Sequence, residues 1–230
     1  MKQELLLQPR LQAIARLVPQ GSRLADVGTD HGYIPVWLLL EGRISSAIAS
    51  DIGAEPLAHA RRTAEQCAVT SGIDFRLCDG LSAVAPEEVD TIVIAGMGGD
   101  TIAAILELAP WTKRGKTLLL QPMTKAEVLR RWLPEHGYRV TAEQLAADKG
   151  VLYPILTAEG GKMQPISQAQ AEGGILLQDD PLWGIYLDKR ILRLRRAALG
   201  MQRGADARLT ERIREMEETV RQLVRWRETQ

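Results

Sequence analysis

Acidic or glycine-containing segments follow four of the five short apolar runs in the 230-residue sequence, and a Gln-Pro pair follows the fifth. If these runs are parallel strands, all five segments lie at the same edge of one sheet, where ligands of such sheets bind. Carboxylates and glycines at that edge can bind a positively charged ligand that comes close to the backbone. The five segments are Asp26-Val-Gly-Thr-Asp-His-Gly32, Asp51, Asp79-Gly80, Ala95-Gly-Met-Gly-Gly99 and Gln121-Pro122.

The first of these segments contains a glycine turn that disfavours a phosphate ligand. Gly28 permits a tight turn and close ligand approach, but Asp30 stands where a dinucleotide-binding fingerprint has its second glycine. A carboxylate at that place repels a pyrophosphate and attracts a cation. S-adenosyl-L-methionine (SAM) carries a sulfonium and an ammonium group and no phosphate, so it fits this loop.

The later segments can complete an adenosine site. Asp51 comes 23 residues after Gly28, where an acidic residue can accept both ribose hydroxyls, although it could also cap the next helix. Asp79 could bind the adenine amino group or form a simple Asp-Gly turn. Small residues at Ala95 and Gly96 leave an open floor beside the cofactor methyl group, unless the glycines only let the strand turn sharply.

Strand–helix alternation over residues 22–158 predicts the sheet that positions these segments. Fully apolar strands imply a parallel sheet covered on both faces, and two extended runs joined by residues 148–150 predict a β-hairpin. The expected fold is α/β, a Rossmann-like and mostly parallel sheet with a C-terminal antiparallel β-hairpin. Expected strands cover 24–28, 46–52, 74–78, 91–95, 118–120, 138–146 and 151–158, and expected helices cover 1–20, 35–40, 55–70, 100–108 and 124–136, the last with Thr124 and Glu127 as a capping box.

The C-terminal part of the chain has a helical pattern. Apolar residues recur at 4-3-4-3 spacing from Leu187 to Met201 and again from Leu209 to Leu223, with Gly200 and Gly204 between the two segments. A short break between two such seams favours an antiparallel, coiled-coil-like helical hairpin, although one long helix packed on another subunit would show the same seams. We expect a SAM-binding domain at 1–160, a linker at 161–180 and a small α-helical hairpin domain at 181–230.

Charge and composition exclude several classes of protein. Lys+Arg and Asp+Glu both number 29, which excludes a uniformly basic protein and an acidic disordered one. Residues 186–230 nonetheless carry 12 basic and 7 acidic residues, so this segment is either a solvated helical face or a surface that meets a polyanion. Cys67 and Cys78, without a Cys/His cluster, predict neither a disulfide scaffold nor a metal site. With no leader peptide or membrane span in the pattern, we expect a cytoplasmic protein.

Several blocks of the sequence resemble the bacterial TrmK family, the SAM-dependent tRNA methyltransferases that modify N1 of adenine 22. The blocks are Asp26 to Pro35, Ala95-Gly-Met-Gly-Gly99 and Leu120-Gln-Pro122, and Arg10-Leu-x-x-Ile-Ala15 is similar to the family's N-terminal block. The resemblance implies a class I methyltransferase with tRNA as its partner, a monomer that converts SAM to S-adenosyl-L-homocysteine and holds no metal. The expected cofactor-binding residues are Asp26, Gly28, Thr29, Gly32, Asp51, Ile52, Asp79, Gly80, Ala95 and Gly96.

The resemblance also implies which residues meet the substrate. Adenine N1 has a free lone pair at neutral pH and needs no base, so the enzyme must align it and stabilise the positive charge of the product. Asp30 would supply that negative charge, unless it only orders its loop. His31 would hold the base or the cofactor carboxylate, Tyr33 would offer a stacking face unless it only packs at the helix start, and Met97 would pack against a base. The expected substrate-binding residues are Arg10, Gly98, Gly99, Gln121 and Pro122 near the site, with Arg190, Arg193, Arg196, Arg203, Arg208 and Arg212 in the hairpin.

Other functions remain compatible with the sequence. One is a SAM-dependent methyltransferase of another RNA or of a small molecule, with the same fold and cofactor. Another is a non-catalytic adaptor that binds a protein through its helical hairpin, although Asp26, Asp51 and Asp79 argue against an inert core. A nicotinamide oxidoreductase is disfavoured by Asp30.

Overall fold

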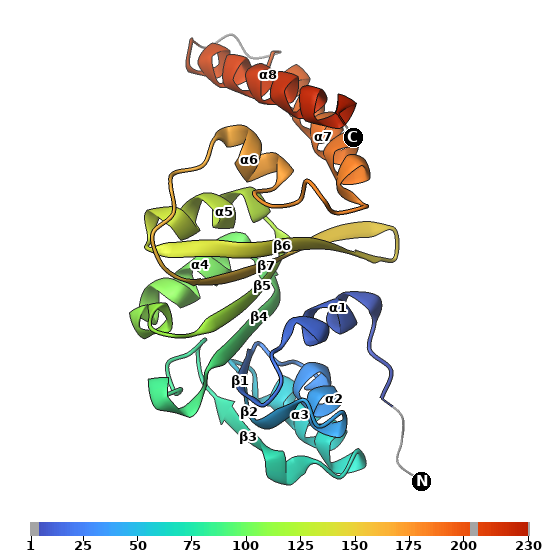
Figure 1. Cartoon of the computed structure of the whole chain (residues 1–230), viewed down its shortest axis with the longest axis vertical. Helices are drawn as coiled ribbons and strands as arrows, with labels where there is room; N and C mark the ends of the chain where they lie inside the picture. Colours follow the sequence, from blue (N-terminus) through green and yellow to red (C-terminus); the bar gives the residue numbers. More distant parts are fainter. Residues whose placement is uncertain (1–4, 203–206, 230) are drawn as a thin grey trace. The chain divides into compact units, whose positions relative to one another are not determined.

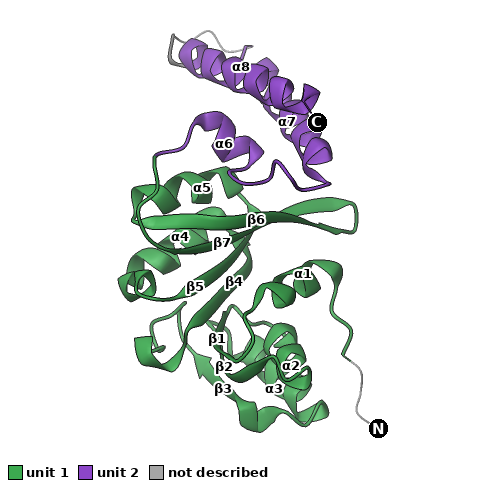
Figure 2. Cartoon of the chain, in the orientation of Figure 1, with its two compact units in different colours: residues 1–164 green, residues 165–230 purple. Residues whose placement is uncertain are grey.

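The computed structural model describes residues 5–202 and 207–229. The chain divides into two compact units, residues 1–164 (unit 1) and residues 165–230 (unit 2), which are coloured separately in Figure 2. Unit 1 contains the sheet, and the regular elements of the described part of unit 2 are helices.

Unit 1 is built on a seven-stranded sheet with the order β3-β2-β1-β4-β5-β7-β6 (Figure 1). Strands β1 to β5 pair in parallel, and β7 pairs antiparallel with β5 and β6, which confirms the predicted sheet and its C-terminal hairpin. The strand order changes direction between β1 and β4, and such a switch point opens a crevice for ligands. The strands are β1 (Ser22–Val27), β2 (Ile44–Asp51), β3 (Ile73–Leu77), β4 (Thr91–Gly98), β5 (Thr117–Thr124), β6 (Tyr138–Asp148) and β7 (Val151–Gly160).

Helices cover both faces of this sheet because its central strands are apolar on both sides. Ile92, Val93 and Ile94 of β4 are each 0% exposed. Val93 belongs to a core that includes residues of α1, α2 and α3, while α4 and α5 contact β4 and β5 on the opposite face (Figure 1). The helices are α1 (Pro9–Leu17), α2 (Tyr33–Leu40), α3 (Ala54–Gln66), α4 (Gly99–Leu108) and α5 (Ala126–Glu135), with short 3-10 turns at Thr70–Gly72, Pro86–Glu88 and Pro110–Lys113.

Strand β5 is longer than the sequence predicts. It runs through Gln121 and Pro122, which pair with Ala95 and Met97 of β4 in an irregular register. Pro122 is tolerated because the pairing with β7 covers only Leu118–Leu120, so its missing N–H removes no bond on that side. The predicted capping box is therefore wrong, since Thr124 lies in β5 and α5 follows Lys125, which has a φ of 55° and makes no side-chain cap.

The hairpin of β6 and β7 turns at Lys149 and Gly150, as the sequence predicts. Their φ angles are 48° and 78°. Positive φ at both central residues is the signature of the tight turns whose twist matches that of antiparallel strands. The hairpin closes the sheet edge beside β5.

Unit 2 contains a hairpin of two packed helices, α7 (Trp183–Met201) and α8 (Ala207–Glu228). Leu187, Ile191 and Leu194 of the predicted seam are at most 7% exposed. Arg227, near the end of α8, lies 3.1 Å from Asp188, near the start of α7, so the two helices run antiparallel. The prediction of a hairpin is confirmed. No helix in the described ranges is long and apolar enough to cross a membrane.

The segment expected as a linker contains a further helix, α6 (Gln168–Gly173). Ser167 caps it, because its hydroxyl accepts a hydrogen bond from the amide of Gln170 at 3.1 Å. Ala169 and Ala171 are at most 1% exposed, and α6 contacts both α7 and α8. The glycine-rich and glutamine-rich composition of this stretch predicts a linker, but the stretch includes a packed helix of unit 2.

A buried ion pair joins α5 to β6 and yields a stability prediction. The side chains of Arg130 and Glu143 are both 0% exposed and lie 2.6 Å apart. Glu143→Gln removes the negative charge that Glu143 places beside a buried guanidinium, so the free energy of unfolding should fall by about 3–5 kcal/mol in urea denaturation. The matched control is Glu159→Gln, because the pair of Glu159 with Arg139 is 39–56% exposed, and it should cost less than about 1 kcal/mol. Equal losses in the two variants would contradict this assignment.

Candidate active site

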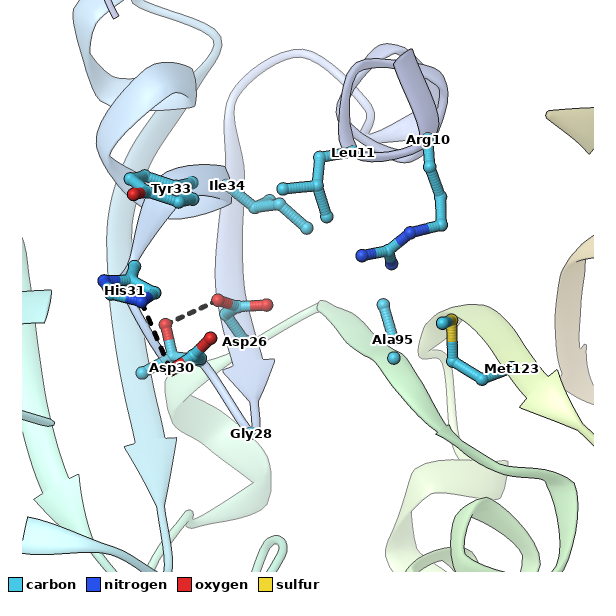
Figure 3. A pocket seen from close by; sticks show the side chains of 12 residues that line it. Arg10, Leu11, Asp26, Gly28, Asp30, His31, Tyr33, Ile34, Ala95 and Met123 are labelled. Atoms are coloured by element: carbon cyan, nitrogen blue, oxygen red, sulfur yellow. Dashed lines mark hydrogen bonds and ion pairs between the residues drawn. The ribbon is translucent and has the colours of Figure 1, made fainter. Parts of the chain in front are cut away.

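A cavity of about 220 Å³ opens at the carboxyl ends of β1 and β4 (Figure 3). Its walls come from α1, from the loop between β1 and α2, from the start of α2 and from the ends of β4 and β5. This is the switch point of the sheet, where the sequence predicts the site. The lining residues are Arg10, Leu11, Asp26, Gly28, Thr29, Asp30, His31, Tyr33, Ile34, Ala95, Gly96 and Met123.

Asp26 is the buried carboxylate of this cavity. It lies near the end of β1, is 5% exposed, and accepts a hydrogen bond of 2.6 Å from the Thr29 hydroxyl. Burial raises the pKa of Asp26 from 3.8 to about 6, the Thr29 bond opposes this rise, and the negative charge of Asp51 adds to it. A cation in the cavity would therefore stabilise the ionised form of Asp26.

The loop after β1 has little free space on its inner side. Gly28 has a φ of 69°, and a methyl group added there would collide with Cε of Met97. Gly32 has a φ of 68°, and a Cβ there would lie 3.0 Å from Cβ of Ala60 in α3. Asp30 also has positive φ, 52°. The loop thus packs tightly against β4 and α3, and glycine is needed at its two closest contacts.

Asp51 fixes this loop and keeps capacity to bind a ligand. Its two carboxylate oxygens accept hydrogen bonds from the amides of Asp30 at 3.2 Å and Gly53 at 2.9 Å. A carboxylate can accept about four hydrogen bonds, so roughly two remain for ligand hydroxyls. Gly53, rather than Asp51, is the N-cap residue of α3. The neighbouring Ile52 is 75% exposed and offers an apolar surface that a flat base could cover.

Asp79 and Gly80 lie outside the main cavity. They line a separate pocket of about 90 Å³ together with Ile105 and Leu108. Leu108 is 82% exposed, which leaves a second apolar surface for a base.

Arg10 reaches the cavity from α1 and is held in place there. Its guanidinium donates a 2.6 Å hydrogen bond to the side-chain carbonyl of Gln121, which also accepts from the amide of Gly96 at 3.2 Å. The guanidinium carbon lies 5.7 Å from the ring centre of Tyr153 in β7. Gln121 is 0% exposed, so its buried side chain holds the guanidinium of Arg10 next to the end of β4.

Three aromatic rings stack at the rim of the cavity. His31 stacks between Tyr33 and His59, with ring centres 5.2 Å and 4.9 Å away, and Nε2 of His31 lies 3.8 Å from a carboxylate oxygen of Asp30. The sequence does not predict a site role for His59, which lies on α3, for Tyr153, or for the cavity residues Leu11, Ile34 and Met123. Nothing in the spacing of these residues indicates that they meet the loop after β1.

Other predicted site residues lie outside the cavity wall. A Cβ at Gly99 would collide with the carbonyl oxygen of Lys125, and one at Gly98 would lie 2.6 Å from a carboxylate oxygen of Asp100, so both glycines allow close backbone packing. Pro122 is buried in β5. Met97 packs beside Gly28, behind the loop.

The predicted arginines of unit 2 differ in their surroundings. Arg190 pairs with Glu172 of α6, and its side chain is only 11% exposed. Arg193, Arg196 and Arg212 are exposed. Arg203 lies outside the described residues, and so does the side chain of Arg208.

The cavity fits the ligand that the sequence predicts. Among the residues that the structure describes, its lining contains two acidic residues, no lysine and one arginine, which donates a hydrogen bond to Gln121. Asp30 occupies the place where a pyrophosphate would need a glycine, and its charge disfavours a dinucleotide. Acidic groups, an exposed Ile52 and a close glycine loop suit a cationic adenosine compound such as SAM.

The chain is similar to known methyltransferases in sequence and structure. Residues 7–156 match a family model described as a methyltransferase domain. The tRNA (adenine(22)-N(1))-methyltransferase of Bacillus subtilis strain 168 is 38% identical over 187 residues, 81% of this chain and 76% of that protein. The crystal structure of B. subtilis TrmK superposes with a TM-score of 0.83 at 30% identity, covering 94% of this chain and 100% of that one. Streptococcus pneumoniae Sp1610 in complex with SAM superposes with a TM-score of 0.81 at 33% identity, over 94% and 100% of the two chains.

The sheet order, the glycine loop after β1 and the acidic residues at the strand ends define a class I, Rossmann-like methyltransferase. The chain belongs to the TrmK family of tRNA (adenine22-N1)-methyltransferases.

The buried Asp26 predicts an unusual pH dependence of stability. Because the folded protein holds this proton more tightly than the unfolded chain, with a pKa of about 6 against 3.8, stability falls as pH rises from about 4 to about 6. Asn cannot ionise, so Asp26→Asn should raise the free energy of unfolding at pH 8 by up to about 3 kcal/mol. The difference should shrink to less than about 1 kcal/mol at pH 4, close to the pKa of the unfolded chain, which serves as the internal control. A variant less stable than the wild type at pH 8 would contradict the prediction.

Proposed function

We propose that this chain transfers a methyl group from SAM to N1 of adenine 22 in tRNA. The observation that carries this proposal is the cavity with a buried Asp26 and a phosphate-excluding glycine loop at the switch point of the sheet. The 38% identity to the B. subtilis enzyme supports the choice of substrate, and the SAM complex of the S. pneumoniae relative supports the choice of cofactor. We propose that the protein acts as a cytoplasmic monomer.

Different residues in and near the cavity would bind different groups of the cofactor. Asp26 would bind the ammonium group, Asp51 the ribose hydroxyls, and Ile52 and Asp79 the adenine. SAM, when bound, supplies an electrophilic methyl group. Asp26→Asn should therefore weaken SAM binding at pH 8 although it stabilises the unliganded fold, because the neutral amide loses the charge attraction.

Asp30 is the residue that would stabilise the product cation. N1 of adenine gains a positive charge when it is methylated, and a fixed carboxylate nearby lowers the energy of that charge. Asp30 is exposed at the rim, where bound RNA would exclude water and strengthen the interaction. The hydrogen bond from its backbone N–H to Asp51 and its left-handed conformation hold the Asp30 backbone at the rim before substrate arrives.

Tyr33, His31 and Arg10 would position the target nucleotide. N1 lies on the Watson–Crick edge, so the base must leave any pair or stack in which it is engaged. The ring of Tyr33, which stacks on His31, would offer a flat surface for such a base. The guanidinium of Arg10 would bind the phosphate beside it, since Gln121 and Tyr153 hold it at the cavity.

Methyl transfer to defined tRNA tests the proposal. Labelled SAM and an unmodified tRNA with adenine 22 should give 1-methyladenosine in nucleoside digests. The same tRNA with guanine at position 22 should give none, because only the target nucleotide has changed. Methylation that persists on the changed tRNA, or none on either tRNA despite SAM binding, would contradict the assigned substrate.

The exposed arginines of α7 should carry part of the tRNA affinity. Reversing both charges in Arg193→Glu/Arg196→Glu should weaken tRNA binding by at least about tenfold and reduce the slope of log K against log salt by about 0.7–0.9 per lost contact. SAM affinity should not change, because the cavity residues belong to unit 1.

The matched control for this variant is Arg214→Glu/Arg221→Glu on α8. These arginines lie on the other helix of the hairpin, 3.8 Å and 2.6 Å from Glu211 and Glu218, so they test whether the loss depends on which helix carries the changed charges. Both variants change the net charge equally. An equal loss of tRNA affinity in both would mean that overall charge, and not the α7 surface, governs binding.

A further inference from the structure

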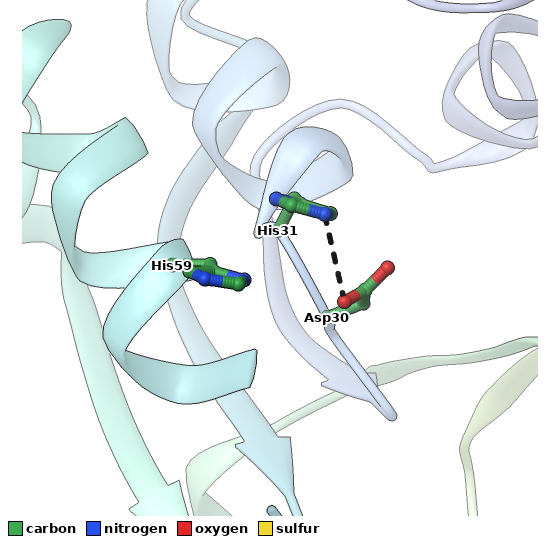
Figure 4. Close-up of side chains that lie close together, drawn as sticks. All are labelled: Asp30, His31 and His59. Carbon is green, nitrogen blue, oxygen red and sulfur yellow. Dashed lines mark ion pairs between the residues drawn. The ribbon is translucent and has the colours of Figure 1, made fainter. Parts of the chain in front are cut away.

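Asp30, His31 and His59 form a cluster of metal-ligating side chains at the rim of the cavity (Figure 4). One ligand atom from each of the three lies within 4.8 Å of the other two. Figure 4 shows a nitrogen of each imidazole ring on the side of Asp30. The two histidines are 28 residues apart in the sequence, so no metal-binding spacing announces them.

The fold itself brings these three residues together. Gly32 packs against Ala60, the residue after His59, and this contact places His31 beside α3. The rings of His31 and His59 stack with an interplanar angle of 7°. Because each ring nitrogen binds a metal in its own ring plane, at least one ring must tilt for both to reach the same ion. The hydrogen bond from the backbone N–H of Asp30 to Asp51 holds the backbone of the third residue beside the two rings.

The three ligand atoms must move closer together to bind a small transition-metal ion. An ion at the centre of a triangle with 4.8 Å sides would lie about 2.8 Å from each ligand atom, while Zn–N and Zn–O bonds are about 2.0–2.2 Å. Rotations of exposed and half-buried side chains can close this gap. Two imidazoles and one carboxylate form a ligand set that Zn²⁺, Co²⁺ and Ni²⁺ bind well and that Mg²⁺ does not favour.

The local charge also favours a cation. Within residues 5–202 and 207–229, His31 is the one basic side chain within 4.0 Å of the Asp30 carboxylate. Asp51 and Asp26 lie close enough to affect each other's ionisation and add negative potential beside the cluster.

We propose that Asp30, His31 and His59 bind a divalent transition-metal ion, with Zn²⁺ as the physiological candidate. Such an ion would engage Asp30 and His31, which line the cavity, and keep them from the incoming base. Bound metal therefore inhibits methyl transfer, a consequence that rests on the proposed function. The site itself does not depend on that function.

Cobalt binding tests the site directly. Titration of the full-length protein with Co²⁺ should give visible d–d absorption and a Kd below about 10 µM, as two imidazoles and a carboxylate predict. His59→Gln should weaken binding by at least about tenfold, and so should Asp30→Asn, because each removes a ligand. Unchanged affinity in both variants, or no binding to the wild type at about 100 µM, would overturn the proposal.

The chain offers two matched controls. His136→Gln removes the third histidine, which stacks on Trp132 away from the cluster, and should leave cobalt binding unchanged. Cys78→Ser removes the partly exposed thiol and should also leave it unchanged. If either control abolishes binding while His59→Gln does not, the metal is bound elsewhere and the proposal fails. SAM affinity, expected to be unchanged in His59→Gln, shows whether that variant folds.

Methyltransferase assays then test the predicted inhibition separately from metal binding. With tRNA as substrate, Zn²⁺ should inhibit the wild type and the His136→Gln variant at concentrations that leave His59→Gln at least about tenfold less affected. If cobalt binds but Zn²⁺ does not inhibit in this way, the predicted inhibition is wrong and the metal site itself stands. If no tRNA is methylated at all, the proposed function fails, and the cobalt titration still decides whether the metal site exists.

Discussion

The loop between β1 and α2 contacts three other elements closely, and the geometry of the whole site depends on these contacts. Gly28 lies against Met97 of β4, Gly32 lies against Ala60 of α3, and the amide of Asp30 bonds to Asp51 of β2. Each contact ties the loop to a different element. Glycine adopts the positive φ of positions 28 and 32 without strain. Asp30 has a φ of 52°, and a non-glycine residue keeps such a backbone only where its surroundings enforce it. Because the loop cannot shift, Asp26, Asp30 and His31 are fixed relative to the sheet before any ligand binds.

The electrostatics of the site follow from the same arrangement. Asp26 is buried with a hydroxyl partner and a neighbouring carboxylate, so its ionised form destabilises the unliganded protein. A cationic ligand relieves that destabilisation, whereas a phosphate would increase it. An acidic site of this kind selects SAM over a dinucleotide on the same fold. It also suits a reaction in which positive charge passes from the cofactor to the base, because carboxylates favour the cation at both stages.

The family assignment and the geometry together decide between the functions that the sequence leaves open. An inert adaptor has no need for a buried carboxylate that lowers its own stability, and active sites are where such groups concentrate. An oxidoreductase would need a loop that accepts a pyrophosphate. The hairpin of α7 and α8 carries exposed arginines, although the net charge of the whole chain is zero. A protein that is not basic throughout can bind a polyanion through such a local group of basic residues.

The sequence by itself determined the alternating elements, the strand ends that form the site, the β-hairpin turn and the helical hairpin. These follow from local patterns: apolar runs, glycines that need positive φ, and 4-3 spacing. It misjudged Gln121 and Pro122 as the end of a strand and overlooked α6, because pairing with β4 and burial against α7 and α8 outweigh local composition. Only the tertiary structure placed His59 beside His31, Tyr153 beside Arg10, and Glu172 beside Arg190. Each of these contacts joins residues far apart in the chain, and the packing of whole elements, which no local pattern encodes, decides them.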